Sequence, residues 1–197
     1  MEITTKYFVK ELNFIKNEKM REACAKVLEK VDPEFFVAPA SSTGKYHPTY
    51  ALGEGGLYRH TRAAVNIAAD LLDLKLFDDY DELDKDAIIC ALILHDTCKS
   101  GIDWSSRYTV HEHPILVEKL IRDVLDEEDN GEFAARVAPL IASHMGQWNT
   151  TKWSKVVLPT PGNECEAFVH TCDYLASRKY LEYIFDDEED MLDEDDD

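Results

Sequence analysis

One apolar stretch near the middle of the chain decides how the rest must fold. It reads Ile88-Ile89-Cys90-Ala91-Leu92-Ile93-Leu94-His95-Asp96-Thr97-Cys98-Lys99. Alanine, leucine and isoleucine dominate this stretch, and neither glycine nor proline occurs between Asp84 and Ser100, so the composition predicts a helix. Because the helix is apolar over most of its surface, we expect it to be buried among the other elements.

The polar pair His95-Asp96 follows this apolar run and has two interpretations. An imidazole and a carboxylate are costly to bury without partners. A divalent metal would satisfy both, because histidine offers a ring nitrogen and aspartate one or two oxygens. Alternatively, the pair marks an ordinary helix end, where histidine interacts favourably with the last carbonyl groups and aspartate caps the next turn. The positions of the other histidines favour the metal.

The composition fits one globular domain followed by an acidic tail. The chain has 197 residues, is 45% hydrophobic and carries a formal net charge of −19, and we expect a single domain over residues 1–185. Residues 186–197 contain ten acidic side chains and no basic one, which predicts disorder. Removing these ten from the 40 acidic residues leaves 30 against 21 basic residues, a net charge of −9. This balance argues against a long duplex nucleic acid held on a broad basic surface.

Cysteine usage and hydropathy indicate the compartment. The five cysteines are odd in number and form no Cys-x-x-Cys pair. We interpret them as reduced thiols in a cytoplasmic protein. The sequence shows no signal peptide and no apolar run of about 18 residues, so we expect neither secretion nor a membrane partner.

Helical periodicity extends through most of the chain. Residues 3–30 predict two short helices broken near Asn17, and the prolines and glycines of residues 33–56 predict an irregular segment. Further helices are expected over residues 57–74, 86–95, 111–125, 134–144 and 164–183, with acidic connections at 78–86 and 126–131. No strand-like alternation of any length is present. We therefore predict an all-α bundle of about six to seven helices.

Three further candidate ligands occur at helix ends or on apolar helix faces. His60 lies near the start of the 57–74 helix, His144 ends the 134–144 segment, and Asp173 lies within an apolar stripe of the last helix. A buried carboxylate there needs a partner. Helical bundles build metal sites from side chains that project inward from separate helices. A mixed set of histidine and aspartate suits one or two divalent ions of Mn, Fe, Co, Ni or Zn better than calcium.

The order of these residues resembles the HD-domain phosphohydrolase superfamily. The resemblance covers roughly residues 38–180 and rests on His60, His95-Asp96 with Lys99 three residues on, His113, His144 and Asp173. Three stretches are most similar to the bacterial 3′-to-5′ exoribonuclease branch: Ala38-Pro39-Ala40 leading to His47, Gly55 through Thr61, and His144-Met145-Gly146. Residues 159–173 continue that likeness. That branch usually carries an N-terminal oligonucleotide-binding barrel, whereas nothing strand-rich precedes residue 38 here.

The resemblance implies a ligand set for two metals. One metal would be held by His60, His95, Asp96 and Asp173, and Asp96 would bridge to a second metal held by His113 and His144. His111 competes with His113 for its role. We favour His113 because Pro114 and the helix that follows it fit the superfamily pattern.

The resemblance also implies catalytic roles for Asp96 and Lys99. A hydroxide activated by the metals would attack phosphorus in line, and Lys99 would neutralise a phosphate oxygen as charge builds. Arg178 or Lys179 would steer the leaving side, unless both lie on a solvated helix face.

Loops near the ligands supply the remaining candidates. Lys45 lies in a loop of small residues and would meet a phosphate, unless it is an ordinary solvated lysine. His47 is a candidate substrate contact or a support for a ligand. Four aromatic residues in loops are candidates for stacking on one or two bases: Tyr46, Trp104, Tyr108 and Trp148.

These features lead to a metal-dependent phosphohydrolase that acts on nucleotides or short oligonucleotides. One alternative is a 3′-to-5′ exonuclease on single-stranded nucleic acid. Another is a non-catalytic, metal-stabilised binding module whose acidic tail engages a basic partner. A degenerate module is expected to have lost His60, Asp96 or Asp173, and the presence of all three favours the enzyme.

Overall fold

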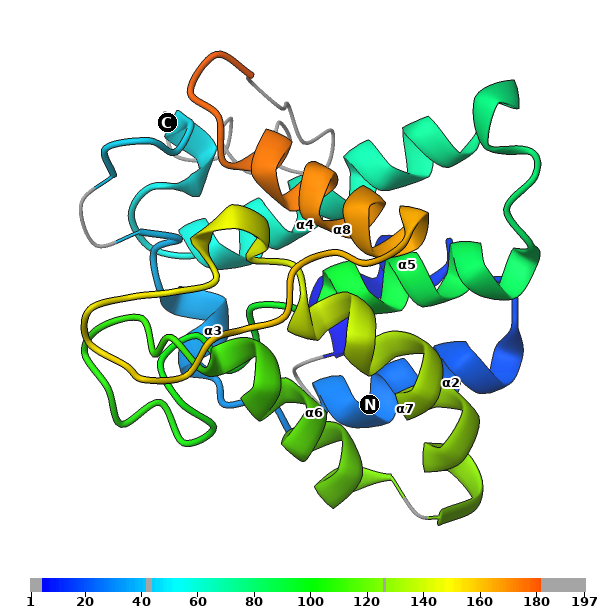
Figure 1. The fold of residues 1–197 in the computed structure, drawn as a ribbon, viewed down its shortest axis with the longest axis horizontal. Helices are drawn as coiled ribbons and strands as arrows, with labels where there is room; N and C mark the ends of the chain where they lie inside the picture. The colour runs from blue at the N-terminus through cyan, green and yellow to red at the C-terminus, as the bar shows by residue number, and fades with distance from the viewer. Residues whose placement is uncertain (1–4, 42–43, 126, 182–197) are drawn as a thin grey trace, which may run out of the picture.

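The computed structural model describes residues 5–41, 44–125 and 127–181 (Figure 1). Within these ranges the chain forms eight α-helices: α1 (Val9–Leu12), α2 (Glu18–Leu28), α3 (Glu34–Val37), α4 (Gly56–Leu72), α5 (Glu82–Leu94), α6 (His113–Val124), α7 (Glu127–Ala142) and α8 (Glu164–Ala176). The same ranges contain no strand, and none of their helices is long and apolar enough to span a membrane. The all-α prediction is therefore confirmed. The acidic tail predicted for residues 186–197 lies outside the described ranges.

Some helix boundaries differ from the prediction for local reasons. α5 begins at Glu82 instead of residue 86, because the Asp81 carboxylate caps the helix by accepting a hydrogen bond from the Asp84 N–H. α7 begins at Glu127 and so includes most of the acidic segment predicted as a break.

Two further differences concern short segments. α8 ends at Ala176, seven residues before the predicted end, and the Ser177 hydroxyl donates a hydrogen bond to the Tyr174 carbonyl at 2.7 Å, which satisfies one terminal acceptor. α3 lies inside the segment predicted to be irregular, where Phe35 and Phe36 are buried.

The apolar stretch that begins at residue 88 lies in the central helix of the bundle. Every residue of α5 from Asp86 to Leu94 is buried, and the helix packs against α2, α4, α7 and α8 (Figure 1). α4 also packs on α8, and α6 packs on α7. The buried apolar side chains of the described helices form one connected core. The C-terminal end of α5 therefore meets residues contributed by several helices.

A glycine fixes the start of α4 and with it the position of His60. A Cβ atom on Gly56 would lie 2.3 Å from the carbonyl oxygen of Ala51, so no other residue permits this approach of the two backbones. The preceding Gly55 has φ +70°, in the left-handed region that glycine tolerates. His60 follows one turn into α4 and is buried.

The buried carboxylate of Asp86 ties the N-terminal segment to α5. Asp86 is only 2% exposed. One carboxylate oxygen accepts the backbone N–H of Lys16 at 2.8 Å, and the other accepts the N–H of Asn17 at 2.7 Å. Asn17 in turn caps α2 by accepting the N–H of Met20. One side chain therefore positions the start of α2 against the central helix.

We expect Asp86→Ala to lower the free energy of unfolding by about 2–4 kcal/mol, because two charge-assisted hydrogen bonds to a buried carboxylate are lost and two partly buried N–H groups are left without this acceptor. Asp84→Ala is the matched control, since this neighbouring carboxylate is 41% exposed in its ion pair with Arg136. We expect the control to change stability by less than about 1 kcal/mol. Urea unfolding curves measure both values, and equal losses would contradict the role given to Asp86.

Candidate metal centre

α5 ends at Leu94, and the next side chain turns into the interior. The Nδ1–H group of His95 donates to the carbonyl oxygen of Leu92 at 2.7 Å. Because a carbonyl only accepts, Nδ1 must carry the proton. The Nε2 atom of His95 then presents a lone pair that is buried and has no hydrogen-bond partner among the described residues. A bound cation would satisfy such a lone pair.

Two further histidines repeat this arrangement. The Nδ1–H of His113 donates to the carbonyl of Val110, and that of His144 donates to the carbonyl of Ile141, each at 2.7 Å. Both Nε2 atoms therefore present lone pairs, and they lie 3.3 Å apart. Two buried lone pairs at this distance repel unless a cation satisfies them. A backbone carbonyl that orients the other ring nitrogen is typical of metal-binding histidines.

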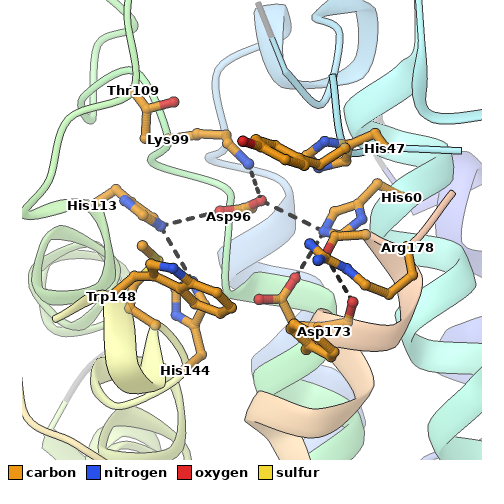
Figure 2. Close-up of a pocket in the computed structure, with 14 residues that line it drawn as sticks. His47, His60, Asp96, Lys99, Thr109, His113, His144, Trp148, Asp173 and Arg178 are labelled. Atoms are coloured by element: carbon orange, nitrogen blue, oxygen red, sulfur yellow. Dashed lines mark hydrogen bonds and ion pairs between the residues drawn. The ribbon is translucent and has the colours of Figure 1, made fainter. Parts of the chain in front are cut away.

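The carboxylate of Asp96 lies between the two sides of the centre (Figure 2). Its Oδ1 atom is 3.2 Å from Nε2 of His113. Its Oδ2 atom is 2.6 Å from Nζ of Lys99, 3.5 Å from Nε2 of His95 and 3.9 Å from Nε2 of His60. One buried carboxylate thus faces histidines from α4 on one side and from α6 on the other.

Asp173 closes the centre from α8. Its Oδ1 atom is 2.9 Å from Nε2 of His60 and 3.5 Å from Nε2 of His95. The Asp173 side chain is 20% exposed, so solvent reaches the carboxylate. His60 on α4 is thus the partner that the sequence required for a carboxylate in this apolar stripe.

The donor atoms fit a divalent metal. Two overlapping sets bring one ligand atom per residue within 4.8 Å of each other: His60, His95 and Asp173, and His95, Asp96 and His144. Imidazole nitrogen and carboxylate oxygen are donors that Mn, Fe, Co, Ni and Zn accept. The first set belongs to the first predicted ligand group. In the second set His95 takes the place that the resemblance gave to His113, although His113 contacts both Asp96 and His144.

Burial and neighbouring charges set the protonation of these groups. Burial, together with the nearby His95 and His113, lowers the pKa of His144 to about 3. Burial also opposes protonation of His95, but Asp96 and Asp173 outweigh it and raise the pKa of His95.

The two carboxylates are held in the anionic form. Burial acts to raise the pKa of each. Lys99 and His95 outweigh it for Asp96, and the neighbouring His60 and His95 outweigh it for Asp173, so that both pKa values lie well below the usual range. Anionic carboxylates and a neutral His144 are the forms that bind a metal.

A cavity of about 460 Å³ (Figure 2), a size typical of small-molecule sites, is lined by the candidate ligands other than His95: His60, Asp96, His113, His144 and Asp173. The remaining wall is formed by Tyr46, His47, Lys99, Thr109, Met145, Trp148, Tyr174, Ser177 and Arg178. The rings of Trp148 and Tyr174 stack with centroids 5.8 Å apart and 13° between their planes. The guanidinium of Arg178 lies 4.2 Å from the Tyr174 ring centroid. The cavity therefore combines metal-binding donors with two cations and an aromatic surface.

Residues 57–182 match the family model of the HD domain. The match covers more than half of the chain and includes every candidate ligand from His60 to Asp173. The chain belongs to the HD domain family. HD domains are typically metal-dependent phosphohydrolases, so membership indicates this general class. No curated protein and no solved structure matches the chain.

In this HD domain the candidate substrate contacts separate into two groups. His47 and Arg178 line the cavity together with Lys99. Lys45 and Lys179 are exposed and do not line it. The Lys45 ammonium lies 5.1 Å from the ring centroid of its neighbour Tyr46. The geometry therefore favours Arg178 over Lys179 and gives Lys45 no contact with the cavity.

His47 lies beside the candidate ligand His60, with ring centroids 5.5 Å apart. Burial lowers the pKa of His47 to about 4, and His60 and Lys99 act in the same direction. Its Nδ1 atom is buried and has no hydrogen-bond partner within the described residues. The ring is neutral near neutral pH and is available to a ligand in the cavity.

His111 and His113 lie on different sides of the start of α6. The ring of His113 faces Asp96, whereas Nε2–H of His111 donates to the carbonyl of Val156 at 3.1 Å. His111 does not line the cavity. Residues two apart in a helical turn point in nearly opposite directions, so only one of the two can face the centre.

The aromatic candidates also divide. Tyr46 and Trp148 line the cavity, whereas Trp104 and Tyr108 line a neighbouring one. The sequence reasoning missed four residues of the wall, Thr109, Met145, Tyr174 and Ser177. Ser177 lies four residues after Asp173, a spacing that places both on one helical face and would have identified it. Thr109 has no such local signal, because a loop brings it to the cavity.

Proposed function

We propose that this HD domain is a metal-dependent phosphohydrolase that cleaves phosphoester bonds of nucleotides or short oligonucleotides. The observation that carries the proposal is the pair of Nε2 atoms of His113 and His144, 3.3 Å apart beside the anionic Asp96. A divalent metal held there would polarise a phosphoryl oxygen and lower the pKa of a coordinated water.

Lys99 and Arg178 supply fixed positive charge next to these ligands. The ammonium of Lys99 is 2.6 Å from Asp96 and lines the cavity. A phosphate in the cavity would meet this ammonium, which would neutralise charge that builds in the transition state. Arg178 is already oriented by the Ser177 hydroxyl at 2.8 Å and by the Tyr174 ring, so it would lose little conformational freedom on binding an anion.

An exposed aromatic surface supports a nucleotide as the substrate. Trp148 is 45% exposed and rests on Tyr174, so a base has a rigid indole face on which to stack. Among the described residues, the cavity lining contains one lysine, Lys99, and one arginine, Arg178. Two cations suit a short substrate better than a long strand.

We also propose that the protein works in the cytoplasm, with no membrane partner and no long duplex nucleic acid as a ligand. The five cysteines are free thiols, four of them buried. Free thiols are typical of a reducing compartment.

Elemental analysis of the purified protein, followed by an activity screen, tests the proposed function. We expect bound Mn, Fe, Co, Ni or Zn and hydrolysis of mononucleotides, cyclic dinucleotides or short RNA or DNA. Bound metal without hydrolysis of any of these substrates would favour the non-catalytic binding module. Protein that binds none of these metals after reloading would contradict the proposal.

Substitution of the two neighbouring histidines tests the geometry. We expect His113→Ala to lower kcat/KM by about 10²-fold or more, because one donor beside Asp96 is lost. The matched variant His111→Ala should stay within about twofold of the wild-type value, since this side chain bonds to the carbonyl of Val156 and does not line the cavity. The reverse pattern would give the role to His111.

A length series distinguishes short substrates from long single strands. We expect substrates of one to a few nucleotides to be cleaved with higher kcat/KM than long single strands, with weak salt dependence, because few cations line the cavity. Rates measured over a series of lengths at low and high salt check this. Faster cleavage of long strands with a steep salt dependence would favour the 3′-to-5′ exonuclease.

A further inference from the structure

A second cavity of about 440 Å³ adjoins the metal centre. Lys99 and Thr109 line both cavities. A ligand that occupied both would pass over Lys99, whose ammonium is 2.6 Å from Asp96. The second cavity is also lined by Trp104, Arg107 and Tyr108. These three residues do not line the cavity at the metal centre.

A loop that is fixed at its base carries these residues. The N–H of Val110 donates to the carbonyl of Lys99 at 2.8 Å, which closes the loop at its neck. Within it, Trp104 has φ +50°, a left-handed conformation that is strained for a bulky residue. Its indole N–H donates to the carbonyl of Thr97 at 3.0 Å, and its ring packs edge-on against Phe35. These contacts hold the loop from the inside.

Arg107 and Tyr108 follow on the outer side of this loop and face solvent. Tyr108 is 67% exposed, and its backbone is fixed by Ser106, whose hydroxyl accepts the Tyr108 N–H and donates to the Tyr108 carbonyl. Arg107 is exposed and makes no hydrogen bond or ion pair within the described residues. Glu34 also lines the second cavity. The charged side chains of this cavity are therefore one carboxylate, Glu34, and two cations, Lys99 and Arg107.

We propose that this second cavity is a nucleoside subsite, and that the substrate is a phosphodiester with a nucleoside on each side of the reacting phosphorus. The smallest such substrate is a dinucleotide. This inference rests on the proposed function, because the candidate metal ligands line the first cavity and Lys99, which contacts Asp96, lines both cavities. One base would stack on Trp148 and the other on Tyr108. Arg107 would stack on the second base or pair with a following phosphate.

The reaction balances with water as the co-reactant. A water oxygen forms a new bond to phosphorus, and the bond from phosphorus to one nucleoside oxygen breaks. The departing oxygen takes up the proton that the water loses. A dinucleoside monophosphate therefore yields one nucleoside and one nucleoside monophosphate.

Two diesters that differ only in the second nucleoside test the subsite. One is a dinucleoside monophosphate, and the other is the nucleoside methyl phosphodiester, in which methanol replaces the second nucleoside. Tyr108→Leu removes the ring, whereas Tyr108→Phe retains it. Arg107→Ala removes the cation, and Arg122→Ala is its control, since Arg122 is an exposed arginine on α6 that pairs with Glu118.

We expect wild-type kcat/KM to be at least about tenfold higher on the dinucleoside monophosphate than on the methyl diester, the effect of one base-stacking contact. Tyr108→Leu and Arg107→Ala should each remove most of this preference and leave the methyl diester within about twofold. Tyr108→Phe and Arg122→Ala should keep the preference. Equal wild-type rates on the two diesters, or variants that slow both diesters alike, would overturn the proposal.

A binding measurement separates failure of the subsite from failure of the proposed function. Tryptophan fluorescence titrated with a dinucleoside phosphorothioate gives Kd without turnover. We expect Tyr108→Leu to raise Kd about tenfold. An unchanged Kd would overturn the subsite even if mononucleotides are hydrolysed and metal is bound. A raised Kd in a protein that hydrolyses no phosphoester would retain the subsite and refute the proposed function.

Discussion

His95→Ala is expected to lose bound metal and hydrolysis together. The Nε2 atom of His95 is shared by both groups of candidate ligands, so its removal weakens both sides of the centre at once. Loss of a partner that only supports a ligand already lowers metal affinity by about 10–100-fold, and loss of a ligand should exceed this. We therefore expect metal content below that of any other single-histidine variant and hydrolysis at background. Elemental analysis and rates on a nucleotide substrate measure the two effects.

The fold of this variant must be checked, because His95 is completely buried and its Nδ1–H bonds to Leu92. His95→Gln fills most of the same volume and provides a second variant with less loss of packing. Circular dichroism and Tm distinguish a folded, metal-free protein from an unfolded one. A folded His95→Gln protein with wild-type metal content and activity would refute the assignment of this residue as a ligand.

Lys99→Ala is expected to lower kcat by about 10²–10³-fold, the usual effect of removing one group that stabilises transition-state charge. Metal content should stay near the wild-type value. The ammonium is 2.6 Å from Oδ2 of Asp96 and competes with a cation for this oxygen, so its loss does not weaken the metal site. Single-turnover rates and elemental analysis on the same preparation check both statements.

Lys85→Ala is the matched control for Lys99→Ala. Lys85 lies in the first turn of α5, where its Nζ atom is 3.9 Å from Oε1 of Glu82. It does not line the cavity. We expect its kcat to stay within about twofold of wild type. If Lys99→Ala instead loses metal or fails to fold, Lys99 has a structural role and its place in catalysis is wrong.

Much of the fold could be predicted from local sequence. The all-round apolar character of residues 88–94 predicted a buried helix, and these residues are buried in α5. The helix boundaries were predicted less well, because caps and end contacts set them. The Asp81 cap extends α5 toward the N-terminus, and the turn at Ser177 stops α8 seven residues early. Such contacts involve single side chains that hydrophobic periodicity does not register.

The sequence by itself also identified residue types with metal-binding chemistry at helix ends, and their order along the chain indicated the HD family. It could not place side chains that only packing brings together. The choice of His113 over His111 depends on which side of the start of α6 faces Asp96, and the partner of Asp173 depends on α8 lying against α4. Thr109 reaches the cavity through a loop closed at Lys99. These are contacts between residues distant in the chain, and they are set by how several helices pack around one buried helix, which no local spacing encodes.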